Sequence, residues 1–264
     1  MRQTKRFAVV GSDARQAAAG RALARAGYTV GGVQQLPQAD CILLPLPLEQ
    51  ADLPLAQLLG TAKPGALALG GKVTESALSI ARAAGVELVD YFARPELTVY
   101  NAIPTAEGCI GILLERRSRT LWGAAVLVLG FGPVGRALAV RLAALGARVT
   151  VAARRPVQRA MAEELGLRAV PLTELVAAAA AFDTVVNTIP APVLTAQVLA
   201  ALPKKSLIVD LASKSGGTDF AAARRLGHTA LHALSLPTVW APETAGEALA
   251  RTVQAILQER EGTV

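Results

Sequence analysis

Short apolar runs alternate with amphipathic segments along most of the chain. The runs end in glycine, proline or a polar residue, as buried parallel strands do, and the segments between them have helical periodicity. The first part of the chain has such runs at residues 41–48, 65–71 and 86–91. The later runs are residues 125–130, 147–153, 168–170, 183–189, 206–212 and 228–234. This alternation predicts an α/β fold with parallel sheets.

An internal repeat predicts how many domains there are. Residues 6–30 and 124–151 share one order of features: an apolar strand, a glycine turn, a helix containing Gly-Arg-Ala-Leu-Ala, a glycine stop and a second strand. Two such βαβ openings predict two doubly wound, Rossmann-like domains with an interdomain cleft.

The second copy of the repeat contains a glycine pattern with a known physical use. Gly130, Gly132 and Gly135 form G-x-G-x-x-G directly between the strand and the helix. The first glycine permits a tight turn, the second lets a pyrophosphate approach the backbone, and the third lets helix and strand pack closely. Pro133 and Val134 begin the helix, whose free N–H groups, from Val134 onward, are offered to the phosphates. We therefore expect a bound dinucleotide; the alternative is an empty turn of the same sequence.

The end of the following strand bears on which dinucleotide is bound. An NAD site usually has a carboxylate about 20 residues after the glycines, where it holds the ribose hydroxyls. This chain has Ala152, Ala153, Arg154 and Arg155 there. Two guanidinium groups could clamp a 2′-phosphate, so we predict NADP. The alternative is that both arginines are simply solvated.

The first copy of the repeat departs from the pattern. Its turn reads VVGSDAR, which lacks the second glycine, and Asp13 would repel a pyrophosphate. We therefore expect residues 1–104 to form a substrate or partner domain. The remaining predicted parts are an interdomain helix at 105–122, the dinucleotide domain at 123–242, and a C-terminal helix at 243–264 that packs back on the first domain.

Composition and charge limit the classes of ligand that we expect this chain to bind. The net charge is +7, but the basic residues are scattered and aromatic residues make up only 4% of the chain, so a nucleic-acid groove is not expected. Small anionic ligands suit this charge better.

No apolar run reaches the length of a membrane span, and no secretory signal is visible, which predicts a cytoplasmic protein. Cys41 and Cys109 form no metal-binding pattern, so we expect no metal.

Several longer stretches resemble one family, the A-subunits of dipicolinate synthase. They are, in order, DYFARPELTVYNAIPTAEG, VLGFGPVGRALAVRLAALGARVTVAARR, NTIP, DLASKSGGTDF and LSLPTVWAPETAG, and they span nearly the whole chain. The resemblance implies an NADP-linked oxidoreductase that forms pyridine-2,6-dicarboxylate (dipicolinate) from 4-hydroxy-tetrahydrodipicolinate, on a branch of the lysine pathway used in sporulation. It also implies that the partner is the flavoprotein-like B-subunit of the synthase, and that the location is the mother cell of a spore-forming bacterium. We expect a homo-oligomer as well.

Ligands of doubly wound folds bind beyond the carboxyl ends of the strands. In the second domain we expect Asn187, Thr188 and Pro190 to line the cofactor, together with Ser213. Lys214 would bring a cation to the substrate, and its alternative is an exposed loop lysine.

The interdomain segment supplies the remaining candidates. A dicarboxylate needs two cationic anchors, and Arg94 and Lys214 could provide one from each wall of the cleft. Glu96 and Tyr91 are the candidates for general base and acid, with a helix or turn cap as the alternative for Glu96. His228 and His232 lie within an expected strand, so we take them as structural.

Two other functions stay open. The layout is similar, more distantly, to two-domain formate/glycerate dehydrogenases and adenosylhomocysteinase. Hydroxyacid dehydrogenases carry a histidine after a proline that follows the last strand, but here Pro237 is followed by Thr238. Another NADP-dependent dehydrogenase is thus one alternative, and a non-catalytic cofactor-binding scaffold for the partner is the other.

Overall fold

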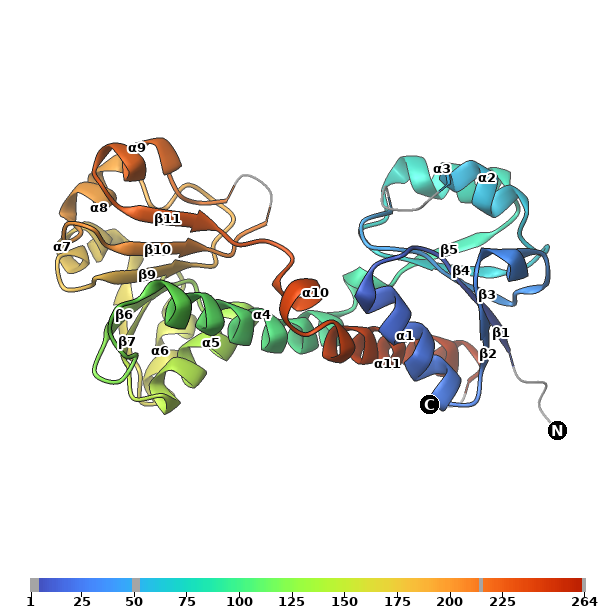
Figure 1. Ribbon diagram of the computed structural model, residues 1–264, viewed down its shortest axis with the longest axis horizontal. Coiled ribbons are helices and arrows are strands. Elements are labelled where there is room, and N and C mark those ends of the chain that lie inside the picture. The colour runs from blue at the N-terminus through green and yellow to red at the C-terminus, as the bar shows by residue number, and fades with distance from the viewer. Residues whose placement is uncertain (1–4, 49–52, 214–215, 263–264) are drawn as a thin grey trace. The chain divides into compact units, whose positions relative to one another are not determined.

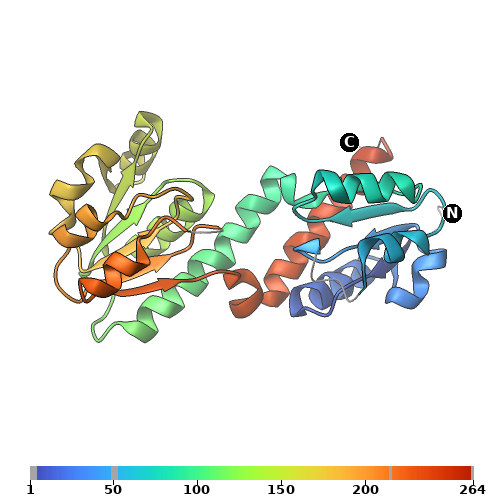
Figure 2. The same cartoon turned by 90° about the horizontal axis from the view of Figure 1, so that it is seen from above.

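The computed structural model describes residues 5–48, 53–213 and 216–262. These residues form two compact α/β units, Met1–Asn101 with Pro237–Val264 (unit 1) and Ala102–Leu236 (unit 2). Each unit has one parallel sheet with helices against it (Figures 1 and 2). The expected fold class, two doubly wound α/β units, is confirmed.

Unit 1 is built on a sheet of order β2-β1-β3-β4-β5. Its strands are β1 (Arg6–Val9), β2 (Thr29–Gly31), β3 (Cys41–Leu43), β4 (Leu67–Gly70) and β5 (Glu87–Asp90). Its helices are α1 (Ala14–Arg25), η1 (Val33–Gln38), α2 (Leu55–Gly60), α3 (Glu75–Ala83), η3 (Tyr91–Ala93), the start of α4 (Pro95–Arg116), most of α10 (Leu236–Trp240) and α11 (Pro242–Arg260).

Unit 2 is built on a sheet of order β11-β10-β9-β6-β7-β8. Its strands are β6 (Ala125–Leu129), β7 (Arg148–Ala153), β8 (Arg168–Pro171), β9 (Thr184–Asn187), β10 (Leu207–Asp210) and β11 (Thr229–His232). Its helices, besides most of α4, are α5 (Pro133–Ala144), α6 (Pro156–Glu164), η4 (Leu172–Glu174), α7 (Leu175–Ala179), α8 (Ala196–Ala201) and α9 (Phe220–Arg225).

The C-terminal helix α11 completes unit 1, although the whole of unit 2 separates it from that unit in sequence. It lies beside α1 (Figure 1). Leu249, Val253 and Leu257 are buried in the same hydrophobic cluster as Leu23 of α1 and Phe7 of β1. This packing stripe recurs at helical spacing, which is why the end of the chain forms a long helix.

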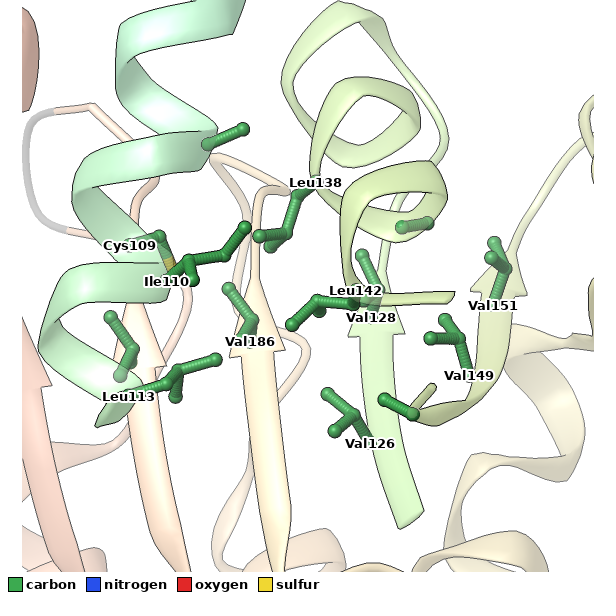
Figure 3. Packing of buried hydrophobic residues seen from close by; sticks show 14 of the residues in the cluster. Cys109, Ile110, Leu113, Val126, Val128, Leu138, Leu142, Val149, Val151 and Val186 are labelled. Atoms are coloured by element: carbon green, nitrogen blue, oxygen red, sulfur yellow. The ribbon is translucent and has the colours of Figure 1, made fainter. Parts of the chain in front are cut away.

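The main core of unit 2 lies between its sheet and helices α4 and α5. Ile110 and Leu113 of α4 and Leu142 of α5 point toward Val128 and Val186 of the sheet (Figure 3). Continuous apolar strands of this kind require cover on both faces, and the second face has its own cluster under α7, α8 and α9.

Helix α4 differs from the expected one. It begins at Pro95, ten residues before the expected start, and it continues through Pro104 to Arg116. Pro95 suits a first helical position, and buried Leu97 and Ala102 extend the apolar pattern ahead of Pro104. Burial therefore outweighs the hydrogen bond that Pro104 cannot make. The boundary between the two units falls inside this helix, between Asn101 and Ala102.

Two smaller observations concern apolar segments. Strand β3 ends at Leu43 and not at Leu48, because the following segment contains Pro45 and Pro47, which have no N–H for a sheet. Helix α4 is also long and apolar enough to span a membrane by composition. Its buried side chains fill the hydrophobic clusters of the two units, which accounts for its hydropathy.

Candidate dinucleotide site

The turn between β6 and α5 contains two glycines that the fold itself requires. Gly130 has a φ of +91°, and a Cβ there would lie 2.6 Å from Thr188 Oγ1. A Cβ on Gly135 would lie 2.2 Å from the carbonyl oxygen of Gly130. Both approaches are closer than van der Waals contact allows. These glycines set the tight turn and the packing of helix on strand.

Gly132 is different, because nothing in the described chain requires a glycine there. Its φ of −79° and ψ of −172° are extended backbone that any residue adopts. Apart from Gly132 itself and its neighbours along the chain, no described atom lies within 4 Å of the position of a Cβ on this residue. Gly132 caps α5, with exposed Pro133 and half-buried Val134 as the first helical residues. The space above it faces the N–H groups of a helix start, where an anion is stabilised.

The turn after β9 closes the other side of this site. Strands β6 and β9 are neighbours at the point where the strand order reverses, which is where doubly wound sheets bind ligands. Thr188 donates from both its backbone N–H and its hydroxyl to the carbonyl of Leu129, at 2.9 and 2.7 Å. Thr188 is therefore fixed against Gly130, and Pro190 is exposed beyond it.

A buried carboxylate that we did not predict organises the loops next to this turn. Asp210, at the end of β10, is fully buried and accepts four hydrogen bonds. Its Oδ1 accepts from Asn187 Nδ2 at 3.0 Å and from the Ala212 N–H at 2.9 Å. Its Oδ2 accepts from the Gly217 N–H at 2.8 Å and from Thr218 Oγ1 at 2.6 Å. Only the position of an Asp at a strand end could have indicated this residue from sequence.

Asn187 is likewise fully buried, and its amide is used within the protein. It donates to the carbonyl of Ile189 at 3.0 Å as well as to Asp210, and its Oδ1 accepts from the Ile189 N–H at 3.0 Å. The side chain thus holds the shape of the NTIP turn. Any contact of Asn187 with a cofactor stays a prediction.

The Gly-Gly pair after β10, Gly216 and Gly217, has a structural reason. A Cβ on Gly217 would lie 2.4 Å from the carbonyl of Ala191, and one on Gly216, whose φ is +72°, would lie 2.9 Å from Asp210 Oδ2. The close approach is therefore to the protein and not to a ligand. Ser213 is exposed at the start of this loop. Lys214 lies outside the residues that the structure describes.

Arg154 and Arg155 follow the last residue of β7, and both side chains are exposed. Within the described part of the chain, no carboxylate pairs with either guanidinium. Their neighbour Arg159 donates to the carbonyls of Ala153 and Arg154, each at 3.1 Å, which fixes the backbone at this strand end. Two cations without a carboxylate partner among the described residues therefore stand at the carboxyl end of β7, and their contact with a 2′-phosphate stays a prediction.

Unit 1 has a turn that corresponds to the expected dinucleotide turn, but protein side chains occupy the places of its second and third glycines. Gly11 has a φ of +103°, like Gly130, but Asp13 stands in the place of Gly132. Asp13 Oδ1 accepts from the Gln16 N–H at 2.8 Å, which caps α1. Gln16 stands in the place of Gly135, and its Nε2 donates to the carbonyls of Val10 and Leu43, at 3.0 and 3.2 Å.

The catalytic candidates of unit 1 are engaged with the protein. Tyr91 is 1% exposed and donates to the carbonyl of Leu44 at 3.2 Å, and burial raises its pKa. Arg94 pairs with both Glu259 and Glu96. Its side-chain hydrogen bonds lower the pKa of Glu96, whereas a general base that works near neutral pH needs a raised one. These contacts weigh against the expected roles, which stay predictions.

Both histidines have main-chain partners. His228 Nε2 lies 2.9 Å from the carbonyl oxygen of Leu199, and His232 Nε2 lies 2.8 Å from that of Ala212. The second contact supports the same loop that Asp210 holds.

Comparison with known proteins now adds to this geometry. Residues 112–215 match the family described as D-isomer specific 2-hydroxyacid dehydrogenase, NAD binding domain. The predicted nicotinamide-binding unit is therefore confirmed.

Similarity over the whole chain decides the family. A crystal structure of the dipicolinate synthase A-subunit from Bacillus halodurans superposes with a TM-score of 0.86 and 31% identity, covering 96% of this chain and 97% of that one. The A chain of dipicolinate synthase from Bacillus subtilis gives 0.86 and 32%, covering 100% and 99%. The chain belongs to the family of dipicolinate synthase A-subunits.

The curated A-subunit sequence of dipicolinate synthase from Bacillus subtilis (strain 168) is 41% identical over 181 residues, which is 69% of this chain and 61% of that relative. Membership of the A-subunit family confirms the resemblance that the ELTVYNAIPTAEG and DLASKSGG runs suggested. It also makes the chain a member of an oxidoreductase-type family with a nicotinamide-binding domain.

Proposed function

We propose that this chain is the NADP-binding A-subunit of a dipicolinate synthase, which forms dipicolinate from 4-hydroxy-tetrahydrodipicolinate together with a flavoprotein-like B-subunit. The observation that carries the proposal is the similarity to A-subunit structures along the whole chain. The reaction removes one water from the ring and then a hydride and a proton, which leaves the aromatic pyridine. Bound NADP supplies a hydride acceptor.

The preference for NADP rests on the end of β7. Arg154 and Arg155 are exposed, and neither has a carboxylate partner among the described residues. The strand itself ends in buried Ala152 and Ala153, so no carboxylate is available there to hold the ribose hydroxyls of NAD. The pyrophosphate would lie over Gly132 at the start of α5.

For the substrate, we propose Lys214 as an anchor of one ring carboxylate. Asp210 accepts from the N–H groups of Ala212 and Gly217, which flank Lys214 in sequence. Lysine provides a point charge suited to a carboxylate. Arg94 is a weaker candidate for the second anchor, because Glu96 and Glu259 already use its guanidinium.

A direct assay tests this function. The purified chain, with and without the B-subunit, would receive the condensation product of pyruvate and aspartate semialdehyde, and the ultraviolet absorbance of the pyridine product would be followed. We expect product only when both proteins and NADP are present. Lys214→Ala should reduce its formation more than about tenfold and leave NADP affinity unchanged. If the complete mixture forms no dipicolinate, the proposed function is wrong.

A second candidate function has one observation in its favour, the match to a D-2-hydroxyacid dehydrogenase domain. A general NADP-dependent dehydrogenase would reduce 2-oxo acids with NADPH as hydride donor, and loss of the NADPH absorbance would report this activity. Thr238 stands where those enzymes carry their histidine, so we expect no such activity.

A scaffold without hydride chemistry would bind NADP but show no change in the nicotinamide absorbance with any substrate.

A further inference from the structure

The edge of the unit 2 sheet where the strands begin carries a groove that the dinucleotide site does not use. Two adjoining pockets of about 650 and 250 Å³ lie there and share Arg117, Ser118, Arg119 and Asp183. Their walls include the first residues of β6, β7 and β10. The glycine turn follows the opposite, carboxyl end of β6, so both sites could be occupied at once.

The groove is strongly basic. Among the described residues, one acidic side chain, Asp183, lines the two pockets, and the basic ones are Arg116, Arg117, Arg119, Arg148, Lys204 and Lys205. Arg117 takes Asp183 as its partner at 2.9 Å. No carboxylate in the described ranges pairs with Arg119, Arg148 or the two lysines. Most of this charge is therefore uncompensated.

The same edge of unit 1 shows that the fold does not require this charge. Its pocket of about 390 Å³ also has basic lining residues. There each cation has a carboxylate: Lys5 pairs with Glu261 at 2.9 Å, Lys63 with Asp40 at 2.6 Å, and Arg260 with Glu87. Since the two sheets are built alike, the excess charge is a property of unit 2 alone.

Backbone geometry supports a use for one of these cations. Lys205, in the turn before β10, has a φ of +61°, a conformation that side chains rarely adopt. The corresponding turn before β4 of unit 1 has Gly65 at this point, with a φ of +76°. A glycine would adopt the turn without strain, so Lys205 places a cation at this edge at a conformational cost.

An exposed aromatic ring borders the basic groove. Trp122 is 80% exposed and lies against the turn before β7, where a Cβ on Gly146 would be 2.6 Å from its ring. The N–H of Gly123 donates to the carbonyl of Gly146 at 2.8 Å, which fixes this segment. Tryptophan and arginine together are the residue types that dominate binding energy at protein interfaces.

We propose that this groove is the docking surface for an acidic segment of a partner protein. Uncompensated cations along a groove are complementary to a row of carboxylates, and Trp122 offers an apolar contact at one end. A nucleic acid suits the groove less well, because a single tryptophan provides no series of rings for stacking bases. The proposal is independent of the reaction that the chain supports.

Trp122 itself can report the binding. In the Trp240→Phe variant, Trp122 is the one tryptophan left, since the sequence contains two. A fluorescein-labelled deca-glutamate peptide would be titrated at physiological ionic strength, with anisotropy and tryptophan emission as readouts. We expect saturable binding with a blue shift of the Trp122 emission, because the ring leaves water on docking.

A charge-matched pair of variants separates the groove from overall charge. Arg119→Glu with Lys205→Glu should weaken peptide binding at least about tenfold. Arg224→Glu with Arg225→Glu changes the net charge equally at residues that line neither pocket, and should leave binding within about twofold. NADP affinity should be the same in both variants, which shows that unit 2 is folded.

Three results would overturn the proposal. The first is no saturable binding to the unmodified chain. The second is an equal loss in both double variants, which would mean attraction to net charge alone. The third is tighter binding of oligothymidylate than of the peptide, lost with Arg119→Glu and Lys205→Glu, which would make the partner a nucleic acid.

Discussion

The turns after β1 and after β6 have the same backbone course but serve opposite purposes. Gly11 and Gly130 both have positive φ and both lead into a helix. In unit 1, Asp13 satisfies the start of α1 with its own carboxylate, and Gln16 binds the ends of β1 and β3. In unit 2 the same places hold Gly132 and Gly135, and the start of α5 is left open. A turn that completes its own hydrogen bonds stabilises the fold, whereas an open one is available to a ligand.

The largest effect is expected when the aspartate that unit 1 has at Asp13 is introduced at the corresponding position of unit 2, Gly132. Gly132→Asp should lower NADP affinity at least about 100-fold, because the new carboxylate caps α5 and repels the pyrophosphate. The backbone accepts the change, and an Asp cap stabilises a helix start, so Tm should stay equal or rise slightly. Calorimetric titration and thermal unfolding measure the two quantities.

The uncharged variant Gly132→Val is the matched control for bulk, and it should also abolish binding in a folded protein. Undiminished NADP affinity in both variants would show that the pyrophosphate does not lie over Gly132.

The second prediction concerns cofactor choice. Replacing Arg154 and Arg155 by Ala should weaken NADP binding at least about tenfold, since charge-assisted hydrogen bonds contribute about 1.5–3 kcal/mol each. NAD affinity should change much less. The control is Arg224→Ala with Arg225→Ala, which should affect neither cofactor. Equal losses of NADP and NAD at the first pair would contradict a 2′-phosphate clamp.

The third prediction compares two carboxylates that hold corresponding loops. Asp210 holds the loop after β10 from a fully buried position, while Asp90 of β5 holds the loop after β4 by accepting from the N–H groups of Lys72 and Val73 near solvent. Asp210→Asn should lower the free energy of unfolding by about 2–3 kcal/mol and Asp90→Asn by about 1 kcal/mol. The amide nitrogen of asparagine replaces one accepting oxygen and cannot accept, and the buried donors that faced that oxygen have no water to replace it, whereas donors near solvent do.

Denaturant unfolding of the two variants would measure this difference. An equal loss in both would show that burial of the Asp210 hydrogen bonds adds nothing to their strength.

The smallest effect is expected from the ion pairs of Arg94. Its hydrogen bonds lower the pKa values of Glu259 and Glu96 below 4.5. Their contribution to stability is therefore present above pH 4.5 and is lost as the pH falls through the lowered values. In Arg94→Leu, Tm should be slightly lower at neutral pH and should converge with that of the unmodified chain as the pH falls below the lowered pKa values. Parallel curves over the whole range would mean that the pairs contribute nothing.

Local patterns in the sequence were sufficient for the fold and for the glycine turn. The apolar runs, the repeat and G-x-G-x-x-G each depend on neighbours within a few residues. Helix α4 was misjudged because burial of Leu97 and Ala102, and not local propensity, carries the helix past Pro104. Burial depends on chain segments that no short window contains.

The site shows the same limit. The roles of Asn187 and Asp210 arise from hydrogen bonds between residues 23 positions apart. Arg94 and Glu96 looked available because Glu259, which occupies Arg94, lies 165 positions away. Polar residues at strand ends thus indicated where a site could lie. They did not show which of these side chains are already hydrogen-bonded or ion-paired within the protein.

The return of α11 to unit 1 has a consequence for how the chain is made. Unit 2 is synthesised before residues 242–260, so it can fold while α1 and β1 still lack the helix that covers them. During that interval Leu23 and its neighbours are open to solvent or to other nascent chains. Helix α1 and strand β1 are therefore synthesised before unit 2 but covered after it, and loss of α11 should leave an aggregating product and not a shortened functional one.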